Sequence, residues 1–419
     1  MHNRITASIG LVAAGTLLAL AAAPTFGATS TDGQEFSQIE RGRYLARAAD
    51  CTACHTTPGA AQPFAGGRPI ETPFGDITTP NITPDLETGI GAWTDDEFDN
   101  AMRNGIRPNG SRLYPAMPYN SYTKMSRSDV MAIRAYLNTV APVQNHVVAN
   151  TLPFPFNIRL VMRVWNALYF NPGEFKPDAS KSAEWNRGAY LVDGPAHCTL
   201  CHTPKSALGG DKTDQYLRGS NLQGWFAPDI TNDDRSGLGR WSIEDITAYL
   251  RTGHNRTTAA TGPMAEEIAH SSSQMTDGDL TAIATYLKSL PGRQDNPPPI
   301  PANDPAMVAG QAIYRDQCSA CHALDGRGIP QLFPSLADSA MVRSSDPTSL
   351  IRILLRGAQS LATSAEPTSP GMPSYNWQLD DAQAAAVLTY IRNAWTPAAP
   401  PVTPHDVGRV RSDRETRAN

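Results

Sequence analysis

The pattern Cys-x-x-Cys-His occurs three times in this chain of 419 residues and uses all 6 of its cysteines. Its members are Cys51, Cys54 and His55, then Cys198, Cys201 and His202, and finally Cys318, Cys321 and His322. In this pattern the two thiols bond covalently to the edge of a porphyrin, and the histidine supplies one axial nitrogen to the iron. The sequence therefore predicts three covalently bound haem c groups and leaves no cysteine for a disulfide.

Two other chemistries use closely spaced cysteines. A structural zinc site needs four ligands, and a thioredoxin-type redox pair does not need a histidine directly after its second cysteine. Here the histidine follows in all three copies, and no further cysteine is present to complete a zinc site. Haem attachment is therefore favoured over both alternatives.

An iron bound by one histidine needs a second axial ligand or keeps an open position. Methionine is the expected second ligand in electron-transfer cytochromes, where it raises the reduction potential. Met117, Met264 and Met372 lie in proline-containing loops, and they follow their motif histidine by 62, 62 and 50 residues. This recurring spacing predicts that these three methionines are the second iron ligands.

Other side chains compete for the same role. The further sulfur donors are Met102, Met125, Met131 and Met275. Met125 and Met131 fall at or inside an expected helix, where methionine more often fills a core. The second iron has two alternative nitrogen donors, His254 and His270.

The remaining histidines, His146, His197 and His405, are interpreted as surface or structural residues. Each motif imidazole needs a fixed orientation, and its second N–H normally donates to a backbone carbonyl. We expect the carbonyl groups to come from the loops that contain Pro80, Pro228 and Pro334.

The elements that must hold these ligands repeat as well. A helix leads into each motif and carries Tyr44, Tyr190 or Tyr314, which we expect to pack inside the helical core beside the haem. The glycine-rich loops 80–93 and 228–241 are related by a constant offset of 148 residues, and each precedes a helix with an N-cap signal. Closing helices with apolar residues at helical spacing are expected near 125–137, 275–287 and 379–391.

This pattern predicts three domains in an all-α fold with long loops. The predicted haem domains are 36–145, 182–292 and 303–397. Linkers are expected at 146–181 and 293–302, and a polar, proline-rich tail at 398–419 is expected to be disordered. The first linker mixes aromatic and basic side chains, so its segment 152–170 is a candidate docking surface, carried by Phe154, Phe156 and Trp165.

The composition sets further bounds. A net charge of −5 argues against a nucleic-acid partner. The N-terminus has a short polar start, an apolar run from Ile9 to Ala23 and small residues up to Ala28, which predicts a cleaved signal peptide over 1–28. Export agrees with the haem motifs, because covalent haem attachment in bacteria takes place outside the cytoplasmic membrane.

Taken together, these stretches resemble the three-haem cytochrome c subunit of bacterial membrane-associated dehydrogenases of the alcohol, gluconate and aldehyde type. The segments that carry the resemblance are 41–45, 80–85, 114–119, 152–159, 182–191 and 262–266. The likeness runs from about residue 39 to residue 397. One departure is the tail, which is polar here, whereas members of the family are often bound to the membrane through the C-terminal part of this subunit.

The resemblance implies three tandem class I-like cytochrome c domains and a non-catalytic electron-transfer subunit of an oxidoreductase. It also implies a catalytic dehydrogenase subunit as partner, ubiquinone as electron acceptor, and a periplasmic location at the outer face of the cytoplasmic membrane, with the membrane surface as a further partner. Two alternatives remain open. A free-standing electron carrier would have the same haem sites, and a haem enzyme such as a peroxidase would have an iron without its methionine.

Overall fold

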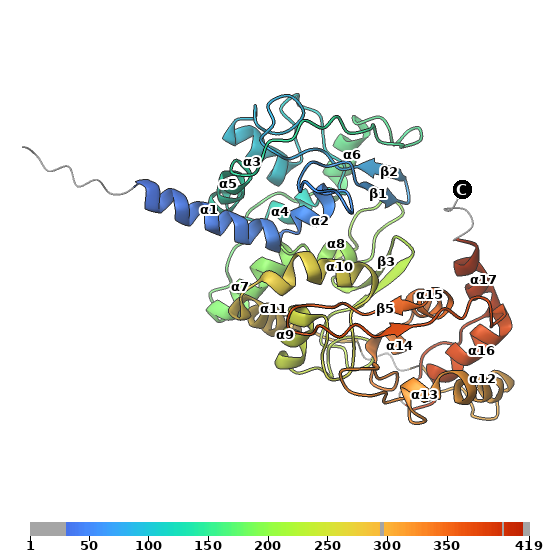
Figure 1. The fold of residues 1–419 in the computed structure, drawn as a ribbon. Coiled ribbons are helices and arrows are strands. Elements are labelled where there is room, and N and C mark those ends of the chain that lie inside the picture. Colours follow the sequence, from blue (N-terminus) through green and yellow to red (C-terminus); the bar gives the residue numbers. More distant parts are fainter. Residues whose placement is uncertain (1–30, 294–296, 396–397, 414–419) are drawn as a thin grey trace, which may run out of the picture.

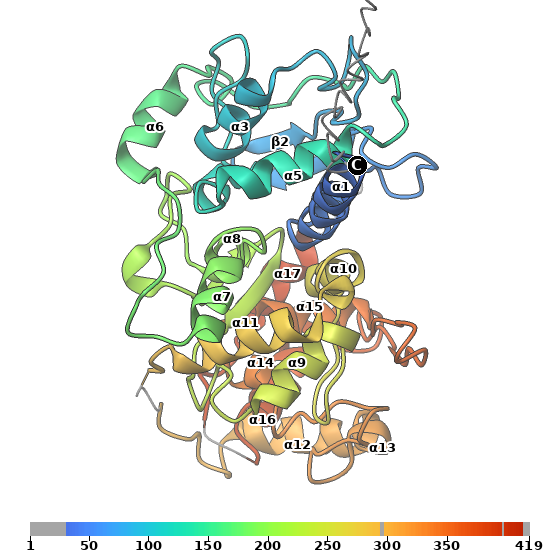
Figure 2. The same cartoon turned by 90° about the vertical axis from the view of Figure 1, so that its left-hand side faces the viewer.

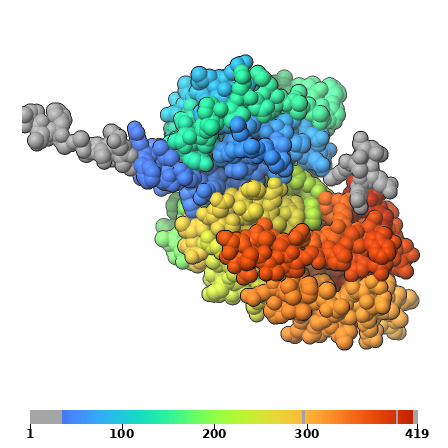
Figure 3. Space-filling model, in the orientation of Figure 1, coloured from blue at the N-terminus to red at the C-terminus, as the bar shows by residue number. Residues whose placement is uncertain are grey.

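The computed structural model describes residues 31–293, 297–395 and 398–413, so the predicted signal peptide lies outside the described residues. The chain folds into three parts, which are stacked in the order in which they occur in the sequence (Figure 1). We call the three parts that contain one motif each unit 1, unit 2 and unit 3. Unit 1 is blue to green, unit 2 is green to yellow, and unit 3 is orange to red at the opposite end of the molecule, as the surface view also shows (Figure 3).

Unit 1 is built from five helices and one hairpin. Their bounds are α1 (Thr31–Ala48), α2 (Cys51–His55), β1 (Pro69–Thr72), β2 (Gly75–Thr78), α3 (Asp95–Asn104), α4 (Tyr119–Tyr122) and α5 (Arg127–Leu137). Helix α3 begins with a capping box between Thr94 and Glu97 and ends at Gly105 in the left-handed conformation, as the sequence signals require. The core lies between α1, α3 and α5 and includes Leu45, Phe98 and Ile133.

Unit 2 repeats this order. Its elements are α7 (Ala183–Asp193), α8 (Thr199–His202), η1 (Thr213–Gln215), β3 (Arg218–Leu222), β4 (Trp225–Asp229), α9 (Ile243–Thr252), α10 (Gly262–His270), η2 (Ser272–Gln274) and α11 (Asp277–Ser289). Helix α10 differs from the expected loop around Met264. The physical reason is Pro263, which occupies the first turn of α10, where its missing N–H breaks no helical hydrogen bond.

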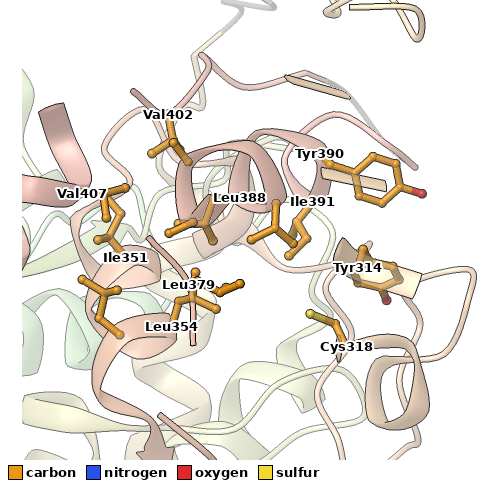
Figure 4. Packing of buried hydrophobic residues seen from close by; sticks show 14 of the residues in the cluster. Tyr314, Cys318, Ile351, Leu354, Leu379, Leu388, Tyr390, Ile391, Val402 and Val407 are labelled. Carbon is orange, nitrogen blue, oxygen red and sulfur yellow. The ribbon is translucent and has the colours of Figure 1, made fainter. Parts of the chain in front are cut away.

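Unit 3 has a shorter loop after its motif. Its elements are α12 (Pro305–Gln317), α13 (Ser319–His322), α14 (Ala340–Arg343), α15 (Thr348–Arg356), β5 (Ala358–Gln359), β6 (Gly371–Met372) and α16 (Asp381–Ile391). The core includes Ile351, Leu354 and Leu388, as Figure 4 shows.

The fold is mostly helical, but the loops contain three short antiparallel pairs of strands, so a purely helical description was incomplete. In unit 2 the hairpin turns at Gln223 and Gly224, which both have positive φ, between the paired residues Leu222 and Trp225. A two-residue turn with both φ positive is the type I′ hairpin turn. The dipeptides that usually indicate this turn in a sequence are Asn-Gly and Asp-Gly. The dipeptide here is Gln-Gly, so the sequence did not indicate a hairpin.

The first and last helices of each unit cross at a glycine. A Cβ on Gly42 would lie 1.8 Å from the carbonyl oxygen of Ala132, and one on Gly188 would lie 1.9 Å from that of Ala282. Gly310 meets Ala386 in the same way, at 2.2 Å. The two helices therefore approach backbone to backbone, which is possible only without a side chain at the crossing.

The tail predicted to be disordered is ordered over 398–413. Helix α17 (Pro404–Ser412) begins with a capping box between Thr403 and Asp406 and packs on α15 and α16. Its buried side chains Val407 and Val410 join the core of unit 3, together with Val402. Figure 4 shows Val402 and Val407 in this core. The prediction of a disordered tail was wrong because it was based on the many proline and charged residues. It did not take into account the three valines that complete this core.

Between units 1 and 2, the connector carries helix α6 (Val161–Tyr169). Trp165 is 7% exposed, and its indole N–H donates to the carbonyl of Leu208 at 2.9 Å. Phe156 packs against Phe74 with ring centroids 4.8 Å apart. Trp165 therefore belongs to the interior and Phe156 is half-buried, so of the three residues expected to form a docking surface only Phe154 is fully exposed.

Units 1 and 2 make reciprocal contacts. In each unit an arginine binds an aspartate of the same unit, as Arg41 does with Asp129 and Arg187 with Asp279. Each aspartate also accepts a hydrogen bond from a tyrosine of the other unit. The positions that correspond in unit 3 hold Ala309, Ala312 and Gln383, so this arrangement joins only the first two units.

No helix within the described ranges is long and apolar enough to cross a membrane.

Candidate haem-binding sites

Each Cys-x-x-Cys-His motif forms a short helical turn at the end of the first helix of its unit. In units 1 and 2 the residue before the first cysteine, Asp50 or His197, has a positive φ, which turns the chain from the long helix into the motif. The three motif turns are α2, α8 and α13, and each contains the second cysteine and the histidine of its motif.

The motif histidines are held as an iron ligand requires. The Nδ1 atom of His55 donates to the carbonyl of Pro80 at 2.8 Å, and that of His202 donates to Pro228 at 2.7 Å. In unit 3, His322 lies 3.0 Å from the carbonyl of Pro334. The predicted hydrogen bonds are present in all three units, and they leave each Nε2 available for a metal.

Burial favours the neutral form of these imidazoles. Desolvation lowers the pKa of His55, His202 and His322, and in each case the hydrogen bond to the proline carbonyl opposes this shift. A neutral imidazole has the free lone pair that binds iron.

The pockets of units 1 and 2 are one continuous cavity of about 1610 Å³. This volume exceeds the range of roughly 300–1,000 Å³ that is usual for one small-molecule site. The chemical groups in its wall are those that haem c requires: Cys51, Cys54, His55, Met117, Cys198, Cys201, His202 and Met264. Apolar side chains such as Phe98, Ile133 and Leu250 complete the wall, so the residues present fit two haem groups in adjoining pockets.

The cysteines have neither the lowered pKa of a redox pair nor the neighbouring ligands of a zinc site. Burial raises the pKa of Cys51 and Cys54 to about 12, so as free thiols they would stay protonated at neutral pH. Redox-active cysteine pairs instead have lowered pKa values. Among the described residues, no group of three or more histidine, cysteine and acidic side chains could hold a metal ion.

The three methionines predicted as second ligands are partly buried but come from different elements. Met117 lies in the turn before α4, Met264 in the first turn of α10, and Met372 in strand β6. Met117 and Met264 line the shared cavity. The sequence could not indicate these different settings, because the proline beside each methionine suits a turn and a helix start equally well.

The competing donors are placed differently. Met125 is fully buried, and Met131 packs against the core of unit 1. Met102 and Met275 also line the cavity, so position alone does not separate them from Met117 and Met264. His254 uses its Nε2 to donate to the carbonyl of Leu361 at 2.6 Å. His270 is exposed at the end of α10.

Unit 3 has a more open site. Cys321 is exposed, while Cys318 is buried and adjoins Tyr314 in the core (Figure 4). The hydroxyl of Tyr314 donates to the carbonyl of Ala323, directly after the motif, at 2.6 Å. Tyr375 donates to the carbonyl of Gln317 at 2.9 Å, directly before it. These two tyrosines fix both ends of the third motif.

A polar cluster between the first two pockets was not foreseen from the sequence. Arg68 of unit 1 forms a paired ionic contact with Glu266 of unit 2 and also donates to the carbonyl of Ala53. Burial raises the pKa of Asp50 to about 9, with further contributions from Glu267 and Glu266. Burial also raises the pKa of Glu267 to about 7. No motif marks these residues, because their contact depends on how two separate units pack.

Comparison with known proteins agrees with this geometry. The cytochrome c family matches three separate regions, 39–141, 186–291 and 307–395, and each contains one motif. The chain is 40% identical to the gluconate 2-dehydrogenase cytochrome c subunit of Pantoea cypripedii, with 94% of each chain covered. It is 37% identical to the cytochrome c subunit of the quinone-type alcohol dehydrogenase of Gluconacetobacter polyoxogenes, over 98% of this chain and 91% of the relative.

A third relative is the fructose dehydrogenase cytochrome subunit of Gluconobacter japonicus, which is 37% identical over 89% of this chain and 82% of its own length. These matches confirm the resemblance drawn from the motifs, and they confirm haem c as the cofactor. The chain belongs to the cytochrome c family, and within it to the cytochrome c subunits of bacterial dehydrogenases.

Proposed function

We propose that this chain is the periplasmic three-haem electron-transfer subunit of a quinone-dependent dehydrogenase complex at the outer face of the cytoplasmic membrane. It accepts electrons from a catalytic subunit that oxidises an alcohol, an aldehyde or a sugar acid. It passes them to ubiquinone or the respiratory chain. The observation that supports this proposal best is the shared cavity, whose wall contains the cysteines, histidines and methionines proposed to hold the first two haem groups.

The predicted site residues would have two roles, haem attachment and iron ligation. The six motif cysteines would hold the porphyrins by covalent bonds, and His55, His202 and His322 would each bind one iron through Nε2. Met117, Met264 and Met372 would supply the second ligand. Haem c, when bound, supplies reversible one-electron chemistry at its iron. With both axial positions filled by protein, no iron would offer an open site to a substrate, and a role in electron transfer follows.

The arrangement of the units supports a relay. Because the first two pockets open into one cavity, their haem groups would lie in adjoining positions, with the contact between Arg68 and Glu266 beside them. Unit 3 is joined to unit 2 by reciprocal hydrogen bonds, in which Arg343 donates to the carbonyl of Arg235 at 2.6 Å and Arg235 donates to that of Arg343. Buried contacts of this kind hold unit 3 against unit 2, as a relay needs, because electron tunnelling is fast only over short distances.

The proposal is tested by reconstitution. The isolated haem-loaded chain should not be reduced by gluconate, ethanol or acetaldehyde. Mixed with its catalytic subunit, it should be reduced by that subunit's substrate and reoxidised by a ubiquinone analogue, as followed by the absorption of reduced haem. Substrate oxidation by the chain alone would identify it as a haem enzyme. Reduction without any stable complex would favour a free-standing carrier.

A further inference from the structure

Helix α6 exposes an apolar face. The residues turned outward occupy positions separated by three and four, so they form one stripe along the helix. The stripe consists of Leu160, Arg163, Val164, Ala167 and Leu168, all of them exposed. Leu160 is 65% exposed, Val164 62% and Leu168 61%. A surface helix normally places polar residues on this side.

The segment before the helix extends the same surface. Phe154 is 78% exposed and Ile158 is 43% exposed. The opposite side of the helix packs in the interior, where Met162 and Trp165 are buried against Tyr114 and Leu152. We call the exposed side chains of Phe154, Ile158, Leu160, Val164 and Leu168 the α6 patch. Helix α6, which carries most of this patch, lies at the outer edge of unit 1, as the turned view shows (Figure 2).

Arginines adjoin the helical part of the α6 patch, and the exposed Asp76 lies opposite Thr151, at the start of the segment before it. No acidic residue occurs between positions 147 and 173, whereas Arg159 and Arg163 lie within this stretch. The guanidinium of Arg159 sits 4.6 Å from the ring centre of Tyr114 and donates to the carbonyl of Arg112 at 2.8 Å. Arg107 is close enough for its charge to help burial lower the pKa of Arg159. Arginines therefore gather beside the apolar stripe.

Two classes of occupant fit an exposed apolar surface. Protein interfaces concentrate their binding energy in tryptophan, tyrosine and arginine, and leucine and valine are under-represented among such residues. In α6 the aromatic Trp165 points inward, and the exposed stripe is aliphatic. Aliphatic side chains next to arginine are typical of helices that lie in the interface of an anionic lipid bilayer.

We infer that the α6 patch docks this chain on the surface of a bilayer that contains anionic phospholipid. The exposed apolar side chains of the α6 patch enter the boundary between headgroups and acyl chains, and Arg163 binds phosphate groups. Val164 and Leu168 also line the shared cavity. If the proposed function holds, docking therefore places the first two haem sites at the membrane surface, where a quinone dissolved in the bilayer can approach them.

The experiment is sedimentation of the haem-loaded chain with vesicles. Vesicles of phosphatidylcholine mixed with phosphatidylglycerol should carry the wild-type chain into the pellet, and vesicles of phosphatidylcholine alone should carry less. The triple variant Phe154→Ser/Ile158→Ser/Leu160→Ser changes patch residues that do not line the shared cavity. It should bind at least about tenfold more weakly, because three apolar side chains no longer enter the bilayer. Arg163→Glu should weaken binding to the anionic vesicles only.

A matched control is the double variant Leu86→Ser/Val308→Ser. It changes exposed apolar residues of unit 1 and unit 3 outside the α6 patch, and it should bind vesicles as the wild type does. Absorption spectra and haem content establish that every variant is folded. Absence of wild-type binding to both kinds of vesicle would overturn the inference, and so would equal binding by the triple variant.

One further measurement separates this inference from the proposed function. Electron transfer from the catalytic subunit is measured in solution without vesicles, and the triple variant should retain it. If this variant binds vesicles normally but no longer forms a complex with the catalytic subunit, the α6 patch is a protein contact and the inference is wrong, while the proposed function stands. If the wild type is never reduced by any catalytic subunit, the proposed function fails and vesicle binding still tests the patch.

Discussion

The hydroxyl of Tyr44 in unit 1 donates a hydrogen bond to the carboxylate of Asp279 in unit 2, 235 residues further along the chain. Its counterpart runs in the opposite direction, from Tyr190 in unit 2 to Asp129 in unit 1. Each carboxylate is also bound by an arginine of its own unit. The two contacts hold the closing helix of one unit against the first helix of the other.

Removing both tyrosine hydroxyls should loosen this contact. In the double variant Tyr44→Phe/Tyr190→Phe, each aspartate loses one donor while its arginine remains. We expect the free energy of unfolding to fall by about 1–3 kcal/mol for each hydroxyl. Denaturant unfolding measures the loss. The control is Tyr122→Phe, whose hydroxyl donates to the carbonyl of Ala49 within unit 1 at 2.8 Å. Only the double variant should also weaken the redox interaction between the first two haem groups.

The glycines at the helix crossings should not tolerate a methyl group. Gly188→Ala should force α7 away from α11 and lower the unfolding free energy of unit 2 by about 2–3 kcal/mol. Gly278 lies in α11, and a Cβ added there would have no neighbouring atom within 4 Å, so Gly278→Ala is the matched control. It should stabilise the chain by about 0.5–1 kcal/mol through helix propensity. Equal effects of the two substitutions on thermal unfolding would refute the role of the crossing.

Each proposed methionine ligand should have its own spectral signature. Met117→Ala, Met264→Ala and Met372→Ala should each remove about a third of the methionine–iron band at the red end of the oxidised spectrum. Each should lower the potential of one haem, because a thioether favours ferrous iron. The matched controls are Met102→Ala and Met275→Ala, which change methionines in the same cavity wall and should leave the band intact. Loss of the band in Met275→Ala but not in Met264→Ala would reassign the second ligand.

Haem content should follow the cysteines. Pyridine haemochrome analysis of the exported chain should give about three covalent haem groups per polypeptide. Cys198→Ala/Cys201→Ala should leave two of them. A wild-type chain that carries haem at only two of its motifs would contradict the three-site proposal.

The Tyr44–Asp279 contact also predicts a pH dependence. Burial alone would raise the pKa of Asp279. The hydrogen bonds from Arg187 and Tyr44 have the larger combined effect, so the pKa lies below its usual value. A carboxylate with a lowered pKa stabilises the folded state fully above its ordinary pKa, near about 4, and this stabilisation is lost as pH falls through the lowered value. The difference in unfolding free energy between the wild type and Asp279→Asn should therefore be constant from about pH 5 to 8 and shrink below about pH 4. A difference that grows on acidification would contradict this assignment.

The sequence predicted the helical repeat well, because each unit contains its own local signals. The motif cysteines, the capped helices and the apolar spacing of the closing helices lie within single stretches of chain. The prolines that accept from His55, His202 and His322 were also found, because their loops repeat with the motifs. Local chemistry of this kind does not depend on how the units pack.

What the sequence did not reveal depends on contacts between distant segments. Tyr44 and Tyr190 were expected only to pack in their own units, and nothing near them in the chain indicates a partner in the other unit. Helix α17 is a different case, because a signal was present. Thr403, Pro404 and Asp406 give an N-cap, a proline in the first turn and an acid at the third position, a combination that marks the start of a helix.

The reciprocal contacts between units 1 and 2 are those that a two-fold axis would impose on two identical chains. Two separate chains held by such an interface would come apart on dilution. Here one polypeptide carries both halves, and the connector over 146–181 keeps them at a high effective concentration. The pair of adjoining pockets therefore does not depend on the abundance of the protein, and a single molecule contains what would otherwise need a dimer.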